Sequence, residues 1–269
     1  MRDFGQTNRD YWNKIIPIHK ASPYYELESF LAGNTTLKTV EENELGDVTG
    51  KKILHLQCHF GLHTMSLERK GAHAVGVDYS SVAIQAASDL SNKVGLTTEF
   101  ICADLYDLPG LLDRRFDIVF TSYGVLYCLE NLDRWASVVA HYLKEDGFFY
   151  IVELHPVFYM LDEEGKQLVN PYFHDPTGRF IRDKPALVVP DAGFHADFQE
   201  WTHSLSDVVN AVLRAGLTIE YLHEHPFIVY NARSYLVADG PGRFKIGGRT
   251  DPLPLMFSLK AHRSAALGH

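Results

Sequence analysis

Apolar and polar positions alternate in short blocks from residue 51 onward. Brief runs rich in β-branched, aromatic or other apolar residues predict strands at residues 51–56, 74–77, 97–102, 116–120 and 148–154. Between these runs, apolar residues recur at helical spacing over residues 61–70, between Ser80 and Gly95, and after Asn131. Because strands that alternate with helices at this spacing form βαβ units, the sequence predicts a parallel sheet flanked by helices.

The segments on either side of this core have different patterns. Residues 156–203 hold five of the twelve prolines and many aromatic residues, which predicts an ordered insertion or flap rather than a linker. Ser204 and Asp207 resemble a capping box at the start of a helix, and strands are expected at residues 217–221 and 255–261. Residues 1–50 are too few to bury a core of their own, so we expect them to be helical, divided by Pro17 and Pro23, and packed over the sheet.

The chain is therefore predicted to be one domain with four parts. These parts are an N-terminal helical cover (1–50), a ligand-binding core (51–155), the insertion (156–203), and a C-terminal helix with strands (204–269).

Composition narrows the possible partners. The net charge of −9 repels phosphate backbones, so a nucleic-acid substrate is not expected. No apolar run approaches the roughly 20 residues that cross a bilayer. The first residues lack a signal-peptide pattern, so we expect a cytoplasmic protein without membrane contact. A homodimer is possible.

Fourteen histidines raise the question of a metal site. The closest groupings are His59 with His63 and His223 with His225, but no nearby carboxylate or cysteine completes a set of three or four ligands. We therefore predict no metal and interpret these histidines as structural.

The segment 53–61 leads from the first strand through a tight loop into a helix, as nucleotide-binding segments do. Asp78 ends the second strand, where a carboxylate can accept hydrogen bonds from both ribose hydroxyls. The G-x-G-x-x-G fingerprint is absent, because Gln57 and His59 occupy positions where glycines would let a pyrophosphate approach. The pattern favours a nucleoside ligand without a pyrophosphate over a dinucleotide.

Five motifs in order over residues 51–155 resemble those of the class I S-adenosylmethionine-dependent methyltransferases. Segment 53–61 is similar to the family's first motif, and Asp78 matches its ribose-binding acid. Asp104 and Leu105 match the adenine-binding motif after the third strand, and residues 116–129 and 143–150 match the fourth-strand motif and the turn into the fifth. The resemblance implies a three-layer Rossmann-like α/β sandwich with a seven-stranded, mostly parallel sheet whose last strand is antiparallel. It also implies S-adenosylmethionine as cofactor and S-adenosylhomocysteine as product.

The first motif departs from the common form of the family. His55 stands in place of the usual Asp, Gln57 and His59 replace two glycines, and only Gly61 is retained. The run Leu-Gln-Cys-His-Phe-Gly is similar to that of a bacterial subgroup, which indicates a working variant. His55 is either part of the site or a core histidine. The resemblance predicts the following cofactor-binding residues: Tyr11, Gln57, Cys58, His59, Gly61, Asp78, Tyr79, Asp104, Leu105, Ser122 and Tyr123.

The expected activity is methyl transfer to a small molecule at oxygen, nitrogen or carbon. Alignment alone supplies much of such a displacement, but a hydroxyl or ammonium acceptor also needs a base. We predict His155 as this base, oriented by Glu153 on the same strand face, with His203 as the alternative. Two other functions stay open: a cofactor-binding module without turnover, and an oxidoreductase with a nicotinamide cofactor.

Overall fold

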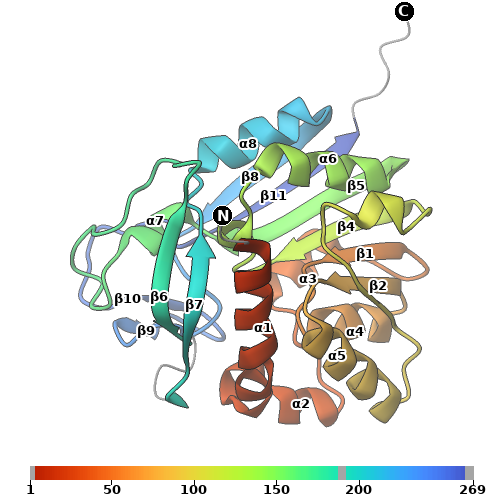
Figure 1. Ribbon diagram of the computed structural model, residues 1–269, viewed down its shortest axis with the longest axis horizontal. Helices are drawn as coiled ribbons and strands as arrows, with labels where there is room; N and C mark the ends of the chain where they lie inside the picture. Colours follow the sequence, from red (N-terminus) through yellow and green to blue (C-terminus); the bar gives the residue numbers. More distant parts are fainter. Residues whose placement is uncertain (1–3, 187–191, 264–269) are drawn as a thin grey trace, which may run out of the picture.

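A seven-stranded sheet forms the centre of the protein in a computed structural model, which describes residues 4–186 and 192–263 (Figure 1). The strand order is β3-β2-β1-β4-β5-β11-β8, and β11 runs antiparallel to both of its neighbours. The strands are β1 (Lys52–Leu56), β2 (His73–Asp78), β3 (Glu99–Cys102), β4 (Phe116–Ser122), β5 (Leu143–Leu154), β8 (Leu217–His225) and β11 (Met256–Arg263). The predicted Rossmann-like sheet with an antiparallel last strand is confirmed.

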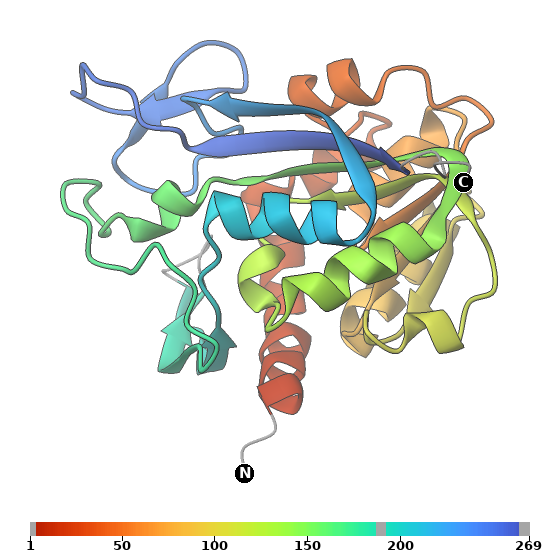
Figure 2. The ribbon, with the colours of Figure 1, turned by 90° about the horizontal axis from the view of Figure 1, so that it is seen from above.

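Helices cover both faces of this sheet (Figures 1 and 2). One layer contains α4 (Leu62–Arg69) and α5 (Ser81–Lys93), and the other contains α6 (Leu132–Tyr142) and α8 (Leu205–Arg214). The predicted caps form: Ser80 and Asn131 accept backbone N–H groups of the first turns of α5 and α6, and Ser204 makes a capping box with Asp207. Short 3-10 turns lie at Pro23–Tyr25, Leu108–Gly110 and Leu126–Cys128. No helix formed by the described residues is long and apolar enough to cross a membrane.

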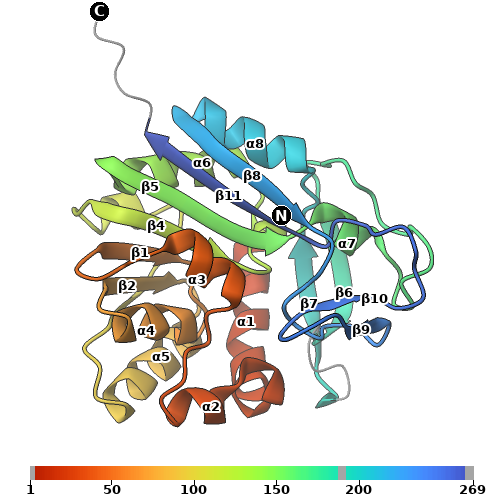
Figure 3. The same ribbon diagram turned by 180° about the vertical axis from the view of Figure 1, so that it is seen from behind.

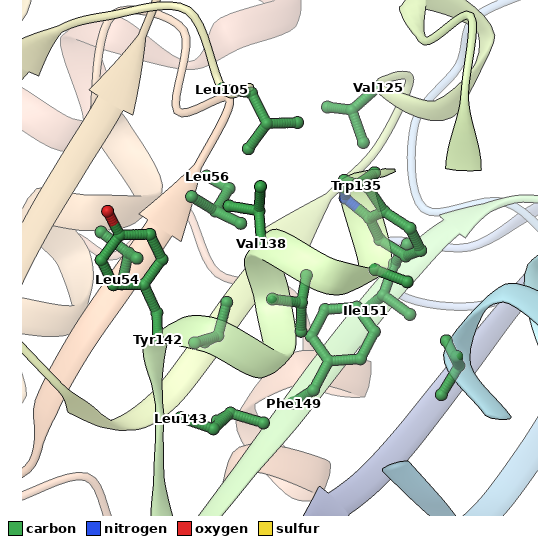
Figure 4. Packing of buried hydrophobic residues seen from close by; sticks show 14 of the residues in the cluster. Leu54, Leu56, Leu105, Val125, Trp135, Val138, Tyr142, Leu143, Phe149 and Ile151 are labelled. Atoms are coloured by element: carbon green, nitrogen blue, oxygen red, sulfur yellow. The ribbon is translucent and has the colours of Figure 1, made fainter. Parts of the chain in front are cut away.

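Apolar residues at helical spacing on α6, such as Trp135, Val138 and Tyr142, pack this helix against the sheet (Figure 4). Trp135 is fully buried and meets Phe149 of β5 edge to face, with ring centroids 5.4 Å apart. Each such buried side chain contributes roughly 1.5–3 kcal/mol through removal of its apolar surface from water. This packing holds the carboxyl ends of the central strands in a fixed arrangement.

The turn expected between α6 and the fifth strand is absent. The chain passes from Tyr142 directly into β5 at Leu143, and the register with β4 shifts between Phe116 and Ile118. Gly147 permits this close approach, because a Cβ there would lie 2.9 Å from the carbonyl oxygen of Asp117. The sequence pattern therefore placed the strand correctly but began it too late.

The N-terminal segment forms α1 (Phe4–Ala21), α2 (Leu27–Leu31) and α3 (Thr39–Leu45). The prediction that Pro17 divides the segment is wrong: α1 continues through this exposed proline and rests on α5 and β7. Only α3 covers a sheet face, where Val40 and Leu45 join the buried cluster of β1, β4 and β5 (Figure 3). Instead, α1 closes the carboxyl edge of the sheet.

The insertion and the C-terminal part add smaller elements beside this edge. The insertion contains α7 (Pro156–Met160) and an antiparallel hairpin of β6 (Arg179–Pro185) and β7 (His195–Glu200). A second small sheet pairs β9 (Leu236–Ala238) with β10 (Phe244–Ile246). The described part of the insertion is thus folded, while the boundaries of the four predicted parts stay predictions.

Candidate functional site

A cavity of about 420 Å³ lies at the carboxyl edge of the sheet, where the chain leaves β1, β2 and β4. The strand order reverses between β1 and β4, which is the point where open α/β sheets bind ligands. All eleven residues predicted to bind the cofactor line this cavity: Tyr11, Gln57, Cys58, His59, Gly61, Asp78, Tyr79, Asp104, Leu105, Ser122 and Tyr123. The structure brings them together, and their individual roles stay predictions.

The loop after β1 has the backbone shape of a glycine-rich loop without most of its glycines. Gln57 and His59 adopt φ angles of +56° and +55°, and Gly61 adopts +80°. A left-handed conformation costs a non-glycine residue on the order of 1 kcal/mol or more, so the surrounding contacts must hold both residues in place. Gly61 itself is required, because a Cβ there would lie 2.5 Å from the ring of Phe100. The loop thus keeps its form despite the departures from the common motif.

Two carboxylates mark one end of the cavity. Asp78 accepts the backbone N–H groups of His59 and Ser80, each at 2.9 Å. Burial raises the pKa of Asp78 to about 6, so most molecules still carry the charge at neutral pH. Asp104 accepts the N–H of Tyr106 at 2.9 Å. Each carboxylate has further lone pairs, which suits it to the hydroxyl and amino groups of a nucleoside.

An imidazole pair that the sequence did not reveal links α1 to this loop. The Nδ1 atom of His19 lies 3.1 Å from Nε2 of His59 and 2.8 Å from the hydroxyl of Tyr25. Burial lowers the pKa of His19 to about 3, so the imidazole is neutral. His59, which replaces a glycine of the common motif, therefore connects α1 to the loop after β1.

A second hydrogen-bonded chain runs beneath the other end of the cavity. His55 lies between Thr64, at 2.8 Å, and Ser122, at 3.4 Å. Ser122 is 3.1 Å from Nδ1 of His63, whose Nε2 lies 3.2 Å from the hydroxyl of Tyr230. His55 is both buried and part of the cavity wall, so the two alternatives from the sequence are not exclusive.

A carboxyl group without a cationic partner lies behind this wall. Glu41 of α3 is 0% exposed, and neither of its carboxyl oxygens completes a well-formed hydrogen bond among the described residues. The hydroxyl of Tyr123 is likewise buried without a hydrogen-bond partner among the described residues. Burial raises the pKa of Glu41 to about 7, partly offset by Tyr123 and by backbone N–H groups at the start of α3. Nothing in the sequence pattern distinguished Glu41 from its surface neighbours.

The predicted pair of Glu153 and His155 does not form. Glu153 accepts the backbone N–H groups of Gly124, Val125 and Leu126 instead. His155 accepts the N–H of Val157 at the start of α7, and its Nε2 lies 3.0 Å from a carboxyl oxygen of Glu224. The reason is Pro156, which begins α7 directly after the strand and turns the chain away. His155 lines neither of the two cavities described, and its expected place in the cleft was wrong.

His203 lines a second cavity of about 750 Å³ under the insertion. Its Nε2 donates to the carbonyl oxygen of Leu129 at 2.7 Å, and burial lowers its pKa to about 4. The two cavities share the side chains Tyr127, Leu154 and Trp201. Within the described residues, no three His, Cys, Asp or Glu side chains are grouped to hold a metal ion.

Comparison with known proteins gives this geometry a context. Residues 54–151 match the family model described as a methyltransferase domain. The chain is 26% identical over 144 residues to a ubiquinone biosynthesis O-methyltransferase from Nitrobacter winogradskyi, covering 51% of this chain. It spans only 53% of the length of that relative.

Solved structures agree with the fold. A putative S-adenosylmethionine-dependent methyltransferase from Listeria monocytogenes superposes with a TM-score of 0.56 at 19% identity, over 83% of this chain and 95% of that one. An S-adenosylmethionine-dependent methyltransferase from Clostridium acetobutylicum gives 0.56 at 17% identity, over 94% and 99%. Residues 54–151 are thus similar to a methyltransferase domain, and the chain has the fold of the S-adenosylmethionine-dependent methyltransferases.

Proposed function

We propose that this protein transfers a methyl group from S-adenosylmethionine to a small-molecule acceptor and leaves S-adenosylhomocysteine. The observation that supports this most is the chemical difference between the two ends of the 420 Å³ cavity. At one end, after β2 and β3, lie the carboxylates Asp78 and Asp104, and at the other, after β4, lies the hydrogen-bonded group of His55, His63, Ser122 and Tyr230. A transferase needs such neighbouring subsites for donor and acceptor, whereas a module that only binds the cofactor does not.

The cofactor fits the first end in charge and in hydrogen bonding. In this proposal Asp78 accepts the ribose hydroxyls, while Asp104 and the backbone at Leu105 hold the adenine. Four carboxylates line the cavity (Glu26, Asp78, Asp104 and Glu130) against two cations (Lys38 and Arg134), and the buried histidines are neutral. This balance favours a cofactor that carries a positive sulfonium.

The remaining predicted residues surround the methionine part. We assign the loop from Gln57 to Gly61 to its backbone contacts, with Cys58 and His59 inside that loop, and Ser122 and Tyr123 to the end of β4. Tyr11 and Tyr79 cover the nucleoside. The bound sulfonium supplies an activated methyl group, so the main tasks of the protein are to align the acceptor and to exclude water.

The acceptor is placed beside the hydrogen-bonded group of His55, His63, Ser122 and Tyr230. A net charge of −9 disfavours a polyanionic nucleic acid, which agrees with a small molecule. The name of the Nitrobacter relative favours oxygen as the methylated atom. His203 remains a candidate for the base, and it would serve an acceptor that binds in the second cavity. A homodimer and a cytoplasmic location stay predictions from the sequence.

Turnover and binding separate the three functions. Release of label from methyl-labelled S-adenosylmethionine is measured against a panel of phenols, amines and acids, with Asp78→Ala as the control for contaminating enzymes. Calorimetry with S-adenosylhomocysteine and with NAD(P) is run in parallel. Cofactor binding with labelled product supports the proposal. Binding without turnover on any acceptor points to a non-catalytic module, and binding of NAD(P) alone points to an oxidoreductase.

A further inference from the structure

The second cavity, of about 750 Å³, offers space that the methyl donor does not need. Most of its lining residues belong to the insertion, and residues 231–234 after β8 lie beside them (Figures 1 and 3). The first cavity, at about 420 Å³, is near the lower end of the roughly 300–1,000 Å³ that one drug-sized ligand fills. Since S-adenosylmethionine is a ligand of that size, the first cavity has room for it and for little more than the reacting end of an acceptor.

The two cavities adjoin at three side chains. Tyr127, Leu154 and Trp201 line both of them. A ligand that contacts these side chains from the second cavity is therefore next to the cofactor cavity. The second cavity is thus well placed to hold the part of the acceptor that does not react.

A mostly buried ammonium group lies at this junction. Lys184 of β6 lines the second cavity and is 13% exposed, and its Nζ lies 5.0 Å from the ring centroid of Tyr127. Its Nζ pairs with Glu200 at 2.5 Å, but the guanidinium of Arg179 binds the same carboxylate. Two cations therefore share one carboxylate. Because an ammonium has three N–H donors, Lys184 can bind a second anionic oxygen on the cavity side.

The other ionic groups of the cavity wall leave this positive charge in place. Glu153 accepts the backbone N–H groups of residues 124–126. Arg233 adds a further cation and pairs with Glu163 at 3.5 Å, but Glu163 is 85% exposed, so solvent screens that pair. A ligand carboxylate can replace Glu163 there. Since Glu153 and Glu200 are already bound by other groups, the cavity suits a ligand with one negative charge.

We propose that the second cavity binds a carboxylate of the methyl acceptor beside Lys184, and that the acceptor is therefore an organic acid. This inference rests on the proposed function. The carboxylate end lies in the second cavity, the middle of the acceptor passes Tyr127 and Trp201, and the reacting atom lies beside the cofactor. The aromatic rings at the junction favour a flat, apolar segment between the two polar ends of the acceptor.

Lys184 also holds the β6–β7 hairpin through Glu200, so a loss of affinity alone would not separate binding from structure. The test therefore compares an acid with its uncharged amide. Calorimetry on protein saturated with S-adenosylhomocysteine uses 3-(4-hydroxyphenyl)propionate and 3-(4-hydroxyphenyl)propionamide as probes. The wild-type protein should bind the acid about tenfold more tightly than the amide, as expected for one charge-assisted hydrogen bond.

Three variants locate this preference. Lys184→Gln should reduce it to about threefold or less, whereas Lys184→Arg should retain it because the positive charge is kept. Lys166→Gln is the matched control, since Lys166 is an exposed lysine of the insertion that lines neither cavity and pairs with Glu164 at 2.9 Å. In assays of labelled methyl transfer, acids should be better acceptors than their methyl esters, and Lys184→Gln should lose this difference.

Several outcomes overturn the proposal: no binding of the acid by wild type, equal binding of acid and amide, or an unchanged preference in Lys184→Gln. An equal loss of affinity for both probes in Lys184→Gln would assign Lys184 a structural role instead. Tighter binding of 2-(4-hydroxyphenyl)ethyl phosphate than of the acid would replace the carboxylate with a phosphate ester.

Calorimetry with S-adenosylhomocysteine alone on every variant distinguishes this inference from the proposed function. If the cofactor binds and only acceptors without a carboxylate are methylated, the proposed function stands and the organic acid is wrong. If the cofactor does not bind to the wild-type protein, the proposed function itself is wrong.

Discussion

Replacing Glu41 with glutamine should change how the stability of this protein depends on pH. Burial raises the pKa of Glu41 in the folded state from 4.5 to about 7. Between these two values the folded protein binds more protons than the unfolded chain, so the free energy of unfolding falls as pH rises. Above pH 7 both states are ionised and the loss is complete. Glu41 therefore destabilises the fold most at alkaline pH.

The size of the effect follows from the shift. One pKa unit corresponds to 1.36 kcal/mol, so Glu41 should cost the wild-type protein about 2.5 kcal/mol more at pH 8 than at pH 5. Glutamine has no such dependence. Its amide has a fixed burial cost, which is the same at both pH values and cancels from the comparison. Asp78 and the buried histidines titrate in wild type and variant alike, so they also cancel.

Urea unfolding of wild type, Glu41→Gln and Glu42→Gln at pH 5 and pH 8 measures this difference. The advantage of Glu41→Gln over wild type should grow by about 2–3 kcal/mol from pH 5 to pH 8, and Glu42→Gln should follow wild type within about 0.5 kcal/mol. A stability difference between wild type and Glu41→Gln that is equal at both pH values would refute the reasoning. It would mean that the carboxyl is ionised without cost, through water or a partner.

Three further variants test the rest of the site. Asp78→Ala should weaken binding of S-adenosylmethionine by about two orders of magnitude in calorimetry, because a carboxylate that accepts two hydrogen bonds is lost; the exposed Asp107→Ala should bind as wild type does. Gly61→Ala should lower the free energy of unfolding in urea by about 2 kcal/mol or more, because its Cβ would lie 2.5 Å from the Phe100 ring at a φ of +80°. Unchanged stability would show that the Phe100 ring can move aside at little cost. His155→Ala should cost about 1 kcal/mol by loss of the cap on α7, with cofactor affinity and turnover unchanged; a strong fall in turnover at normal stability would restore it as the base.

The part of the cavity around Asp78 and Asp104 could be predicted from the sequence because its determinants are local. Asp78 and Asp104 each follow a strand directly, and the carboxyl ends of parallel strands meet at one edge of a sheet. Once the alternation of strands and helices is recognised, the positions of such residues follow without knowledge of packing. The caps Ser80 and Ser204 were predictable for the same reason, since each acts within four residues of itself.

Other parts of the cavity and its surroundings were decided by tertiary structure alone. His19, Glu41 and Tyr230 lie at the cavity or behind its wall and come from α1, α3 and the segment after β8, respectively, and no periodicity links them to β4. The predicted pairing of Glu153 with His155 was wrong for a more local reason. Their spacing was right for one strand face, but the geometry of Pro156 and the amides of residues 124–126 gave each side chain a different partner.

The physical reason is the range of the forces involved. Hydrophobic period, capping and turn chemistry act over a few residues, so the sequence by itself determined which segments form the central strands and helices and where the loop after β1 lies. Burial, by contrast, depends on everything that packs around a group. The same carboxyl that would be an ordinary surface charge on α3 has its pKa raised to about 7 only because three other elements close over it.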